Sequence, residues 1–187
     1  MDLNRLHHCW FAIQVKPRHE FIAAKLLRSK GYEEFVPWYR SRRQWSDRIK
    51  EIDLPLFTGY IFCRFDSEIR WPVVNTQGVI RIVGSSKGPE AIPDPEIESI
   101  RRVIESGLNP QPCDYIKSGD RVRIVGGPLA GVEGAMISIR NRRQLILSID
   151  LVQGSVVVDI DQCSMSTGIP ILLPGMDFDA MNAPKIC

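Results

Sequence analysis

The sequence lacks the features that mark several large classes of protein. No apolar run approaches the roughly 20 residues that a bilayer-spanning helix needs, and segment 1–10 carries charges and histidines where a signal peptide would be apolar. The five cysteines are scattered singly, with no CxxC pair, which fits neither a disulfide framework nor a zinc site. We therefore expect a cytoplasmic protein with reduced thiols and no membrane contact.

Catalytic signatures are also scarce. The three histidines all lie within segment 1–19, and the sequence contains no HExxH pattern. The Gly-rich segment 126–131 lacks the GK[ST] that a P-loop requires, and Pro128 removes a phosphate-binding N–H group. A tight turn that needs the freedom of glycine explains this segment better. We expect no enzyme activity, no cofactor and no metal.

The net charge is only +2, but basic residues gather locally. One cluster surrounds Trp45 and comprises Arg40, Arg42, Arg43, Arg48 and Lys50. Such a cluster attracts phosphates without regard to sequence, and Trp45 could stack on an unpaired base. A solvated loop explains the same pattern, so both interpretations stay open.

Segment 1–107 mixes strand and helix patterns. Strands are predicted at 10–15, 34–38, 49–54, 56–65 and 79–83, and a short helix at 68–75. A longer helix follows His19, with Ile22, Ala23, Leu26 and Leu27 on one face and Gly31 at its end. Asp94-Pro95-Glu96 predicts the start of another helix, with Asp94 as its cap. The irregular order favours an α+β domain with a mostly antiparallel sheet flanked by helices.

The pattern changes after residue 107. Segment 108–116 contains Asn109-Pro110-Gln111-Pro112, which is typical of an extended linker. Within 117–163, apolar residues alternate over 145–151 and 156–160, and turn residues separate these runs. This pattern predicts a small all-β, SH3-like barrel. The tail 164–187 carries an apolar patch at 169–173, and its order is not predicted.

Two groups of motifs resemble the NusG family. Gly119–Ile124 followed by Gly127–Gly134 is similar to the KOW motif of small barrels in NusG proteins and some ribosomal proteins. In the first half, Lys16-Pro17-Arg18-His19-Glu20 and segments 44–48 and 55–62 occur in the order seen in NusG N-terminal domains. The KPRHE and RQWSDR segments look more like the specialised antiterminators of the RfaH and UpxY type.

This resemblance implies a monomeric transcription elongation and antitermination factor that binds RNA polymerase. An apolar pocket of the family receives the clamp helices of the largest polymerase subunit. The matching positions are Trp10, Phe11, Phe57, Tyr60 and Phe62. Aromatic stripes are often core, but exposed ones form binding hot spots. We expect Phe57 and Tyr60 to face the partner, and Trp10 and Phe62 to be mainly structural.

The resemblance extends to further contacts. A gate loop on the opposite polymerase lobe would meet Arg70, Trp71 and Pro72, and the basic cluster would approach upstream or non-template DNA. Bridging both lobes would favour the closed, processive polymerase and so disfavour pausing. In the barrel, the positions that engage a ribosomal protein or Rho in the housekeeping factor are Val132, Leu151 and Val152.

The specialised type implies action on selected operons, such as polysaccharide clusters. Two alternatives stay open: a housekeeping NusG-type factor, and a KOW protein that binds RNA or the ribosome. The linker is compatible with docked domains or independent ones.

Overall fold

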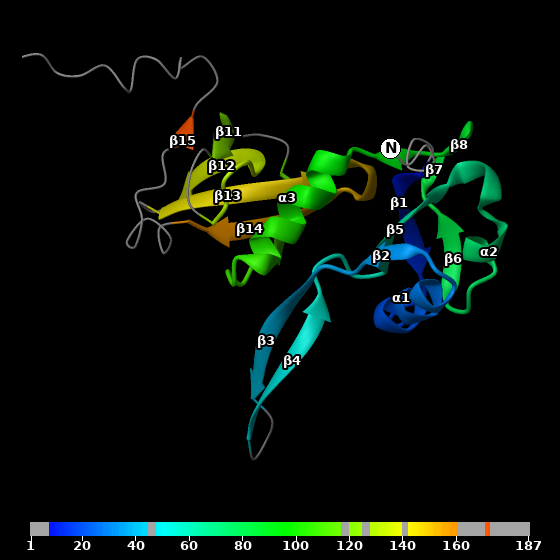
Figure 1. The fold of residues 1–187 in the computed structure, drawn as a ribbon. Coiled ribbons are helices and arrows are strands. Elements are labelled where there is room, and N and C mark those ends of the chain that lie inside the picture. The colour runs from blue at the N-terminus through cyan, green and yellow to red at the C-terminus, as the bar shows by residue number, and fades with distance from the viewer. Residues whose placement is uncertain are drawn as a thin grey trace, which may run out of the picture.

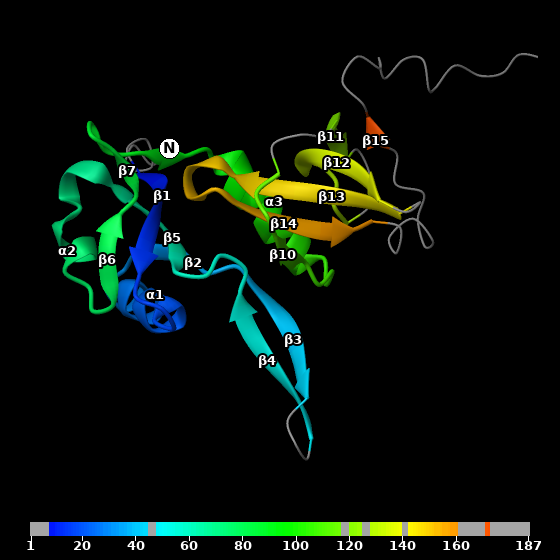
Figure 2. The ribbon, with the colours of Figure 1, turned by 180° about the vertical axis from the view of Figure 1, so that it is seen from behind.

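The computed structural model describes residues 8–44, 48–116, 120–124, 128–139, 142–160 and 171–172. Two β-rich units lie side by side, and a long hairpin extends away from both (Figures 1 and 2). All strand pairings among the described residues are antiparallel, which confirms the predicted α+β class with a second, all-β unit. Among the described residues, no helix is both long and apolar enough to cross a membrane.

The first unit is a five-stranded sheet whose path is β2-β5-β1-β6, with β9 also paired to β1. Its strands are β1 (His8–Val15), β2 (Glu33–Phe35), β5 (Tyr60–Asp66), β6 (Val79–Ile82) and β9 (Ala91–Ile92). Helix α1 (Glu20–Ser29), the 3-10 turn η2 (Ser67–Ile69) and α2 (Trp71–Val74) connect them, and β7 (Gly84–Ser85) with β8 (Gly88–Pro89) forms a small ribbon. The short helix around Pro72 and the strands predicted at 10–15 and 79–83 are confirmed, whereas the strands predicted at 34–38 and 56–65 are shorter, because β2 ends at Phe35 and β5 begins at Tyr60.

Helix α1 packs on one face of this sheet. Ala23 and Leu27 are fully buried there, as predicted, and Gly31 adopts a φ of +87° just past the helix end. The prediction was wrong for Ile22, which is 52% exposed. The buried side of the helix is rotated toward Glu20 and Ala24, because Glu20 turns inward to bind the backbone of a neighbouring turn.

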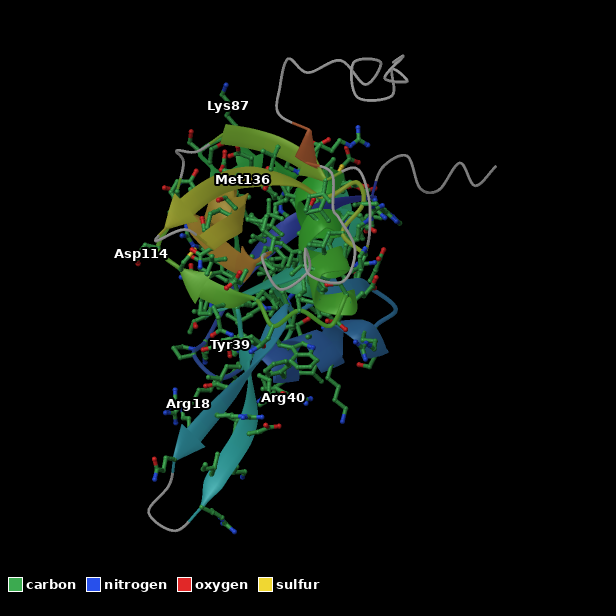
Figure 3. All side chains as sticks on the ribbon, turned by 90° about the vertical axis from the view of Figure 1, so that its left-hand side faces the viewer. Arg18, Tyr39, Arg40, Lys87, Asp114 and Met136 are labelled. Atoms are coloured by element: carbon green, nitrogen blue, oxygen red, sulfur yellow. The ribbon has the colours of Figure 1, made fainter. Side chains whose placement is uncertain are left out.

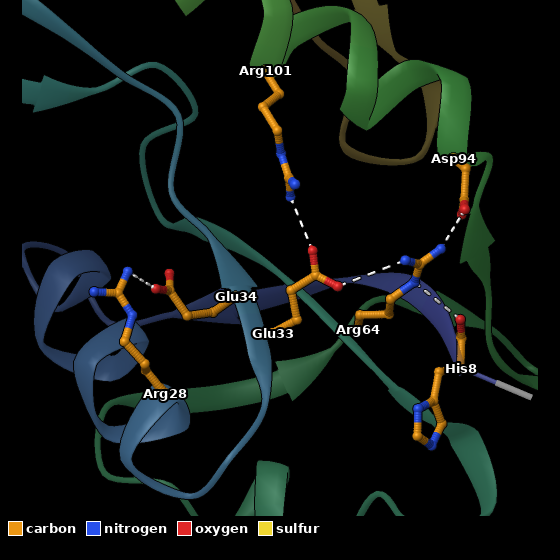
Figure 4. A network of polar contacts seen from close by, with 7 residues as sticks. All are labelled: His8, Arg28, Glu33, Glu34, Arg64, Asp94 and Arg101. Atoms are coloured by element: carbon orange, nitrogen blue, oxygen red, sulfur yellow. Dashed lines mark hydrogen bonds and ion pairs between the residues drawn. The ribbon is translucent and has the colours of Figure 1, made fainter. Parts of the chain in front are cut away.

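Helix α3 (Asp94–Glu105) begins where the sequence predicted, but Asp94 does not cap it. Its carboxylate instead pairs with Arg64 on β5, and Arg64 also lies 3.6 Å from Glu33 on β2. Arg101, near the other end of α3, pairs with the same Glu33 at 3.2 Å (Figure 4). These ion pairs hold α3 against the first sheet.

The second unit is a six-stranded sheet of path β10-β14-β13-β12-β11-β15. Its elements are β10 (Gln111–Cys113), β11 (Asp120–Ile124), β12 (Glu133–Ile139), β13 (Arg142–Ile149), the 3-10 turn η3 (Asp150–Val152), β14 (Gly154–Asp159) and β15 (Ile171–Leu172). Strand β15 is the described part of the tail and pairs with β11. Residues 161–170 and 173–187 lie outside the described residues.

The predicted linker contains strand β10, which pairs with β14 through Gln111↔Val157 and its neighbours. The two proline residues of this segment are compatible with a strand at a sheet edge, where an N–H group is not needed. The segment is thus part of the second unit's sheet. The domain boundaries at 107 and 117 stay a prediction.

One hydrophobic cluster runs through both units without a break. It joins Trp10 and Phe62 of the first sheet to Ile97 and Ile100 of α3, and continues into the interior of the barrel, with Leu145 among its members. Helix α3 lies across β13 and packs on β12 and β13 (Figures 1 and 2). The two units are therefore docked, with α3 between them.

Candidate functional site

Five aromatic side chains gather on the barrel side of the first sheet. We call this set the aromatic face: Trp10, Phe35, Phe57, Tyr60 and Phe62. The Phe57 ring meets Phe62 edge-on at a centroid distance of 5.5 Å, and Phe35 lies 6.4 Å from Phe62 on the other side. Strand alternation places Tyr60 and Phe62 on this face and Ile61 and Cys63 on the opposite one.

Phe11 is not part of this face. Because it neighbours Trp10 on β1, its side chain points to the other side of the sheet. There it packs 4.7 Å from Phe65, in the smaller core beneath α1. The resemblance placed Phe11 in a common pocket with Trp10, and that grouping was wrong.

Phe57 is buried, with 5% of its surface exposed, so the expectation of an exposed ring is wrong for the chain as it stands. Its cover comes from the barrel. A Cβ atom added to Gly154 would lie 2.6 Å from Cδ1 and 2.8 Å from Cε1 of Phe57, so the two units are in full contact here. Tyr60 is half-buried and packs against the same cluster.

The turn that presents Phe57 is fixed by contacts that sequence reasoning missed. Gly59 has a φ of +82°, and its N–H group donates to Oε1 of Glu20 at 2.8 Å. Its carbonyl accepts from the Val15 N–H group at 2.8 Å. Glu20 is 2% exposed, and no local pattern indicates this, because the partner of its carboxylate is a backbone N–H group 39 residues away.

Trp10, predicted to be mainly structural, is buried beneath α3. It is 3% exposed, and the guanidinium groups of Arg64 and Arg101 lie 5.6 Å and 5.5 Å from its ring centroid. Cation–π attraction and the ion pairs of both arginines therefore hold α3 over this end of the face. Phe62, also predicted to be structural, is fully buried.

Polar contacts join α3 to the barrel at the glycine-rich turn between β11 and β12. Arg102 donates from Nη1 to the Ala130 carbonyl at 2.6 Å, and the Glu133 N–H group donates to Ser99 Oγ at 3.4 Å. Gly131, at φ +83°, leaves room for the arginine, since a Cβ would lie 2.5 Å from Nη1. Gly131, which belongs to the KOW-like segment, therefore lies directly beside a side chain of the first unit.

A groove between α3, the first sheet and the barrel is lined mostly by charged side chains, including Arg64, Arg102, Arg123, Glu98 and Glu133. These charges pair with one another, as in Arg102–Glu98 at 3.5 Å and Arg123–Glu133 at 3.7 Å. The groove is thus a polar seam of the docked interface. Within the described residues, no group of His, Cys, Asp and Glu is arranged to hold a metal ion.

The three residues assigned to the gate-loop contact lie at the surface. Arg70 and Pro72 are exposed, and Trp71 is 71% exposed beside Ile69 at 63%. Helix α2 is anchored by Val73, which is buried in the core beneath α1. A large apolar side chain that stays exposed on a firmly packed turn is unusual, and it is suited to contact with a partner.

The basic cluster lies on a hairpin formed by β3 (Trp38–Gln44) and β4 (Ile49–Pro55). A loop followed by a single strand was expected here. Its side chains project into solvent around Arg40 (Figure 3). Arg40 lies 3.7 Å from Asp53, and Arg42 lies 2.9 Å from Glu51, so part of the charge is neutralised across the strands. Arg43 and Arg48 are exposed, and Lys50 interacts with another group of the protein. Trp45 lies outside the described residues.

The predicted barrel surface is only partly a surface. Val132 is fully buried in the shared cluster, so its assignment to a partner surface was wrong. Leu151 and Val152 are half-buried and pack against the same cluster. Both residues belong to the turn η3, which precedes Gly154, the residue that covers Phe57.

Two of the described thiols, those of Cys63 and Cys113, match the prediction of inert cysteines. Burial, followed by the charges of Glu34 and Glu33, raises the pKa of Cys63 to about 12. Burial also raises the pKa of Cys113, with a smaller effect from Asp114. Both are therefore protonated at neutral pH and poor nucleophiles. Cys9 is exposed and free, and Cys163 and Cys187 lie outside the described residues.

Comparison with known proteins gives a consistent picture. The family described as "Transcription termination factor nusG" matches residues 8–101, which is half of the chain. The transcription termination/antitermination protein NusG of Campylobacter jejuni is 25% identical over 176 residues, covering 88% of this chain and 94% of that protein. NusG of Borreliella burgdorferi is 32% identical over 131 residues, covering 64% and 70%.

A solved structure titled "Domain interaction in Thermotoga maritima NusG" aligns with 81% of this chain and 92% of its own, at 20% identity and a TM-score of 0.48. Members of the matched family are transcription factors and not enzymes. The aromatic face lies within the matched residues, and the barrel that covers it carries the KOW-like turn. The chain belongs to the NusG family of transcription termination and antitermination factors.

Proposed function

We propose that this chain binds RNA polymerase through the aromatic face and suppresses pausing and termination. The observation that carries this proposal is the construction of the face. Phe57 and Tyr60 sit on a rigid turn, backed by Phe62, and Phe57 is covered by the second unit. Clustered aromatic rings on a firm base are the usual form of a protein-binding hot spot.

The partner that we propose is the pair of clamp helices of the largest polymerase subunit, as the resemblance to NusG implies. In the docked chain the barrel occupies this surface, so the barrel must move before the helices can bind. The two states form an equilibrium, and the polymerase draws the chain toward the open state by binding that state alone. Weak binding by the free protein follows, because only the open fraction is competent.

Two further contacts complete the proposal. Trp71, flanked by Arg70 and Pro72, meets the gate loop on the opposite lobe of the polymerase, and its exposure supports this role. The β3–β4 hairpin approaches upstream or non-template DNA, supported by its projection from the body and by exposed Arg43 and Arg48 (Figure 3). Contacts on both lobes favour the closed, processive polymerase.

Leu151 and Val152 are half-buried against the shared cluster, and we expect them to become more accessible when the barrel leaves the first unit. A ribosomal protein or Rho would then meet them, whereas Val132 stays inside the barrel. An RNA- or ribosome-binding protein is the alternative function. The barrel's described surface gives it little support, because Arg123, its described arginine in the polar seam, is already paired with Glu133.

Replacing Tyr60 with alanine tests the polymerase-binding proposal. Tyr60 is half-exposed on the aromatic face, so its loss removes contact area while the core stays intact. We expect binding to purified elongation complexes, measured by co-sedimentation, to weaken about tenfold. The matched control is Ile80→Ala, which removes a 50%-exposed apolar side chain from β6. Equal binding by wild type and both variants would contradict the proposal.

We further propose that the chain is a specialised antiterminator that acts on selected operons, on the basis of its KPRHE and RQWSDR segments. Deletion of the gene should then reduce distal transcripts of one or a few long operons, as measured by RNA sequencing, and leave most terminators unchanged. A housekeeping factor predicts the opposite result, with altered pausing or termination across the genome. The same experiment therefore separates the two members of the family.

A further inference from the structure

The side-chain amide of Asn109 binds the β3–β4 hairpin, and this contact has no part in the proposed function. It lies between α3 and β10, and its side chain binds the backbone of Arg40 on β3. Oδ1 accepts from the Arg40 N–H group at 3.1 Å, and Nδ2 donates to the Arg40 carbonyl at 3.2 Å. The amide thus pairs with β3 as a residue of a neighbouring strand would.

The contact is made on the free edge of the hairpin. Within the described part of the chain, β3 pairs with β4 alone, and Arg40 lies opposite Asp53 in that ladder. The backbone groups of Arg40 point away from β4, since they bind Asn109. An isolated two-stranded ribbon is marginally stable in water. An added pair of hydrogen bonds near its base therefore restricts how the ribbon can move.

Asn109 cannot stay in place if the barrel departs with β10. Only Pro110 separates Asn109 from Gln111, which pairs with Val157 on β14. Consecutive Cα atoms are about 3.8 Å apart, so a shift of β10 by more than roughly 8 Å pulls Asn109 away from Arg40. The position of the barrel and the contact with the hairpin are linked by the chain itself.

We infer that Asn109 is a positioning residue that couples barrel docking to the hairpin. In the docked chain it holds β3 in a fixed direction. When the barrel leaves, the contact breaks and the basic hairpin becomes free to reorient toward nucleic acid. This inference rests on the proposed function for its biological meaning, because the hairpin's nucleic-acid contact is part of that proposal. The coupling itself can be tested without polymerase or DNA.

Amide hydrogen exchange at Arg40, resolved by NMR on the full chain, reports directly on the contact. The Arg40 N–H group is bound by Asn109, whereas the Ser41 N–H group faces Ile52 across the ladder. In Asn109→Ala we expect exchange at Arg40 to rise roughly five- to tenfold, the effect of one lost hydrogen bond. Exchange at Ser41 serves as the internal control and stays unchanged.

A second variant separates coupling from a merely local role. Gly154→Ala places an atom against the Phe57 ring and should displace the barrel. If Asn109 transmits that displacement, Gly154→Ala accelerates Arg40 exchange in the wild-type background, and adds nothing in the Asn109→Ala background. Faster exchange at the Glu133 N–H group, which donates to Ser99 Oγ on α3, shows that the barrel has moved.

The inference fails if the barrel moves, as seen in faster exchange at the Glu133 N–H group, while Arg40 exchange in Gly154→Ala matches wild type. That result would mean that β10 detaches from β14 and stays with Asn109. It would leave polymerase binding by the aromatic face untouched. Conversely, a chain that shows the coupling but does not bind elongation complexes would overturn the proposed function alone.

Discussion

Gly154→Ala is expected to increase the affinity of the chain for the polymerase clamp helices by about 5- to 150-fold. The new methyl group would lie 2.6 Å from a ring atom of Phe57, a distance that folded proteins do not tolerate. Overpacking of this kind costs about 1–3 kcal/mol, and here the cost falls on the docked state alone. The docked fraction decreases, and the competent fraction rises by the same factor.

The substitution is well suited to this purpose because the added methyl group makes no clash within the barrel. Within the barrel the nearest neighbour of the added atom is Val152 Cγ2 at 3.5 Å, an ordinary contact. Fluorescence anisotropy with a labelled clamp-helix fragment measures the affinity. Gln153→Gly is the matched control, since it alters the adjacent residue of the same turn and relieves a φ of +49° without adding an atom.

Unchanged affinity in Gly154→Ala, with exchange at the Glu133 N–H group also unchanged, would show that the Phe57 ring rotates aside while the units stay docked. Unchanged affinity with faster Glu133 exchange would be more damaging. The face would then be uncovered without binding the fragment, and the aromatic face could not be the polymerase site.

Phe57→Ala should separate opening from binding. The ring fills space against both Gly154 and Phe62, so its loss weakens docking and speeds exchange at the Glu133 N–H group, which is bound to α3 in the docked chain. The same ring is proposed as the main contact for the clamp helices. A hot-spot ring contributes at least about 2 kcal/mol, so we expect the affinity to fall by about 30-fold or more despite the opening. Gly154→Ala and Phe57→Ala therefore both open the chain and change affinity in opposite directions.

Phe21→Ala provides the control for loss of a phenylalanine. Phe21 is 44% exposed on α1, which packs on the opposite face of the sheet. It should bind the clamp-helix fragment as wild type does. Circular dichroism melts of all variants establish that they are folded at the temperature of the assay. Equal affinity of Phe57→Ala and Phe21→Ala would exclude Phe57 from the binding surface.

Local patterns predicted most of the first unit correctly. Alternation in β5 separated Tyr60 and Phe62 from Ile61, and Gly31 marked the end of α1, because both depend on residues close in sequence. The role of Asp94 could not be predicted in this way. A capping contact and an ion pair compete for the same carboxylate, and Arg64, 30 residues away, determines the outcome.

The residues that form the candidate site could be predicted, but their exposure to solvent could not. Aromatic residue types indicated which positions form the face, but Phe57 is buried by Gly154, almost a hundred positions along the chain, and a single sequence gives no sign of such a contact. Strand β10 and the outer part of β3 were missed for a similar reason. Their residues have weak strand propensity, and partners on β14 and β4 impose the extended conformation.

The buried position of the aromatic rings also matters when no polymerase is at hand. A free chain that carried Phe57, Tyr60 and their neighbours in water would present an apolar patch of the kind that drives self-association. Folding the barrel over these rings removes the patch from water and so opposes self-association of the unbound protein. The second unit would thus preserve a supply of usable factor between rounds of transcription.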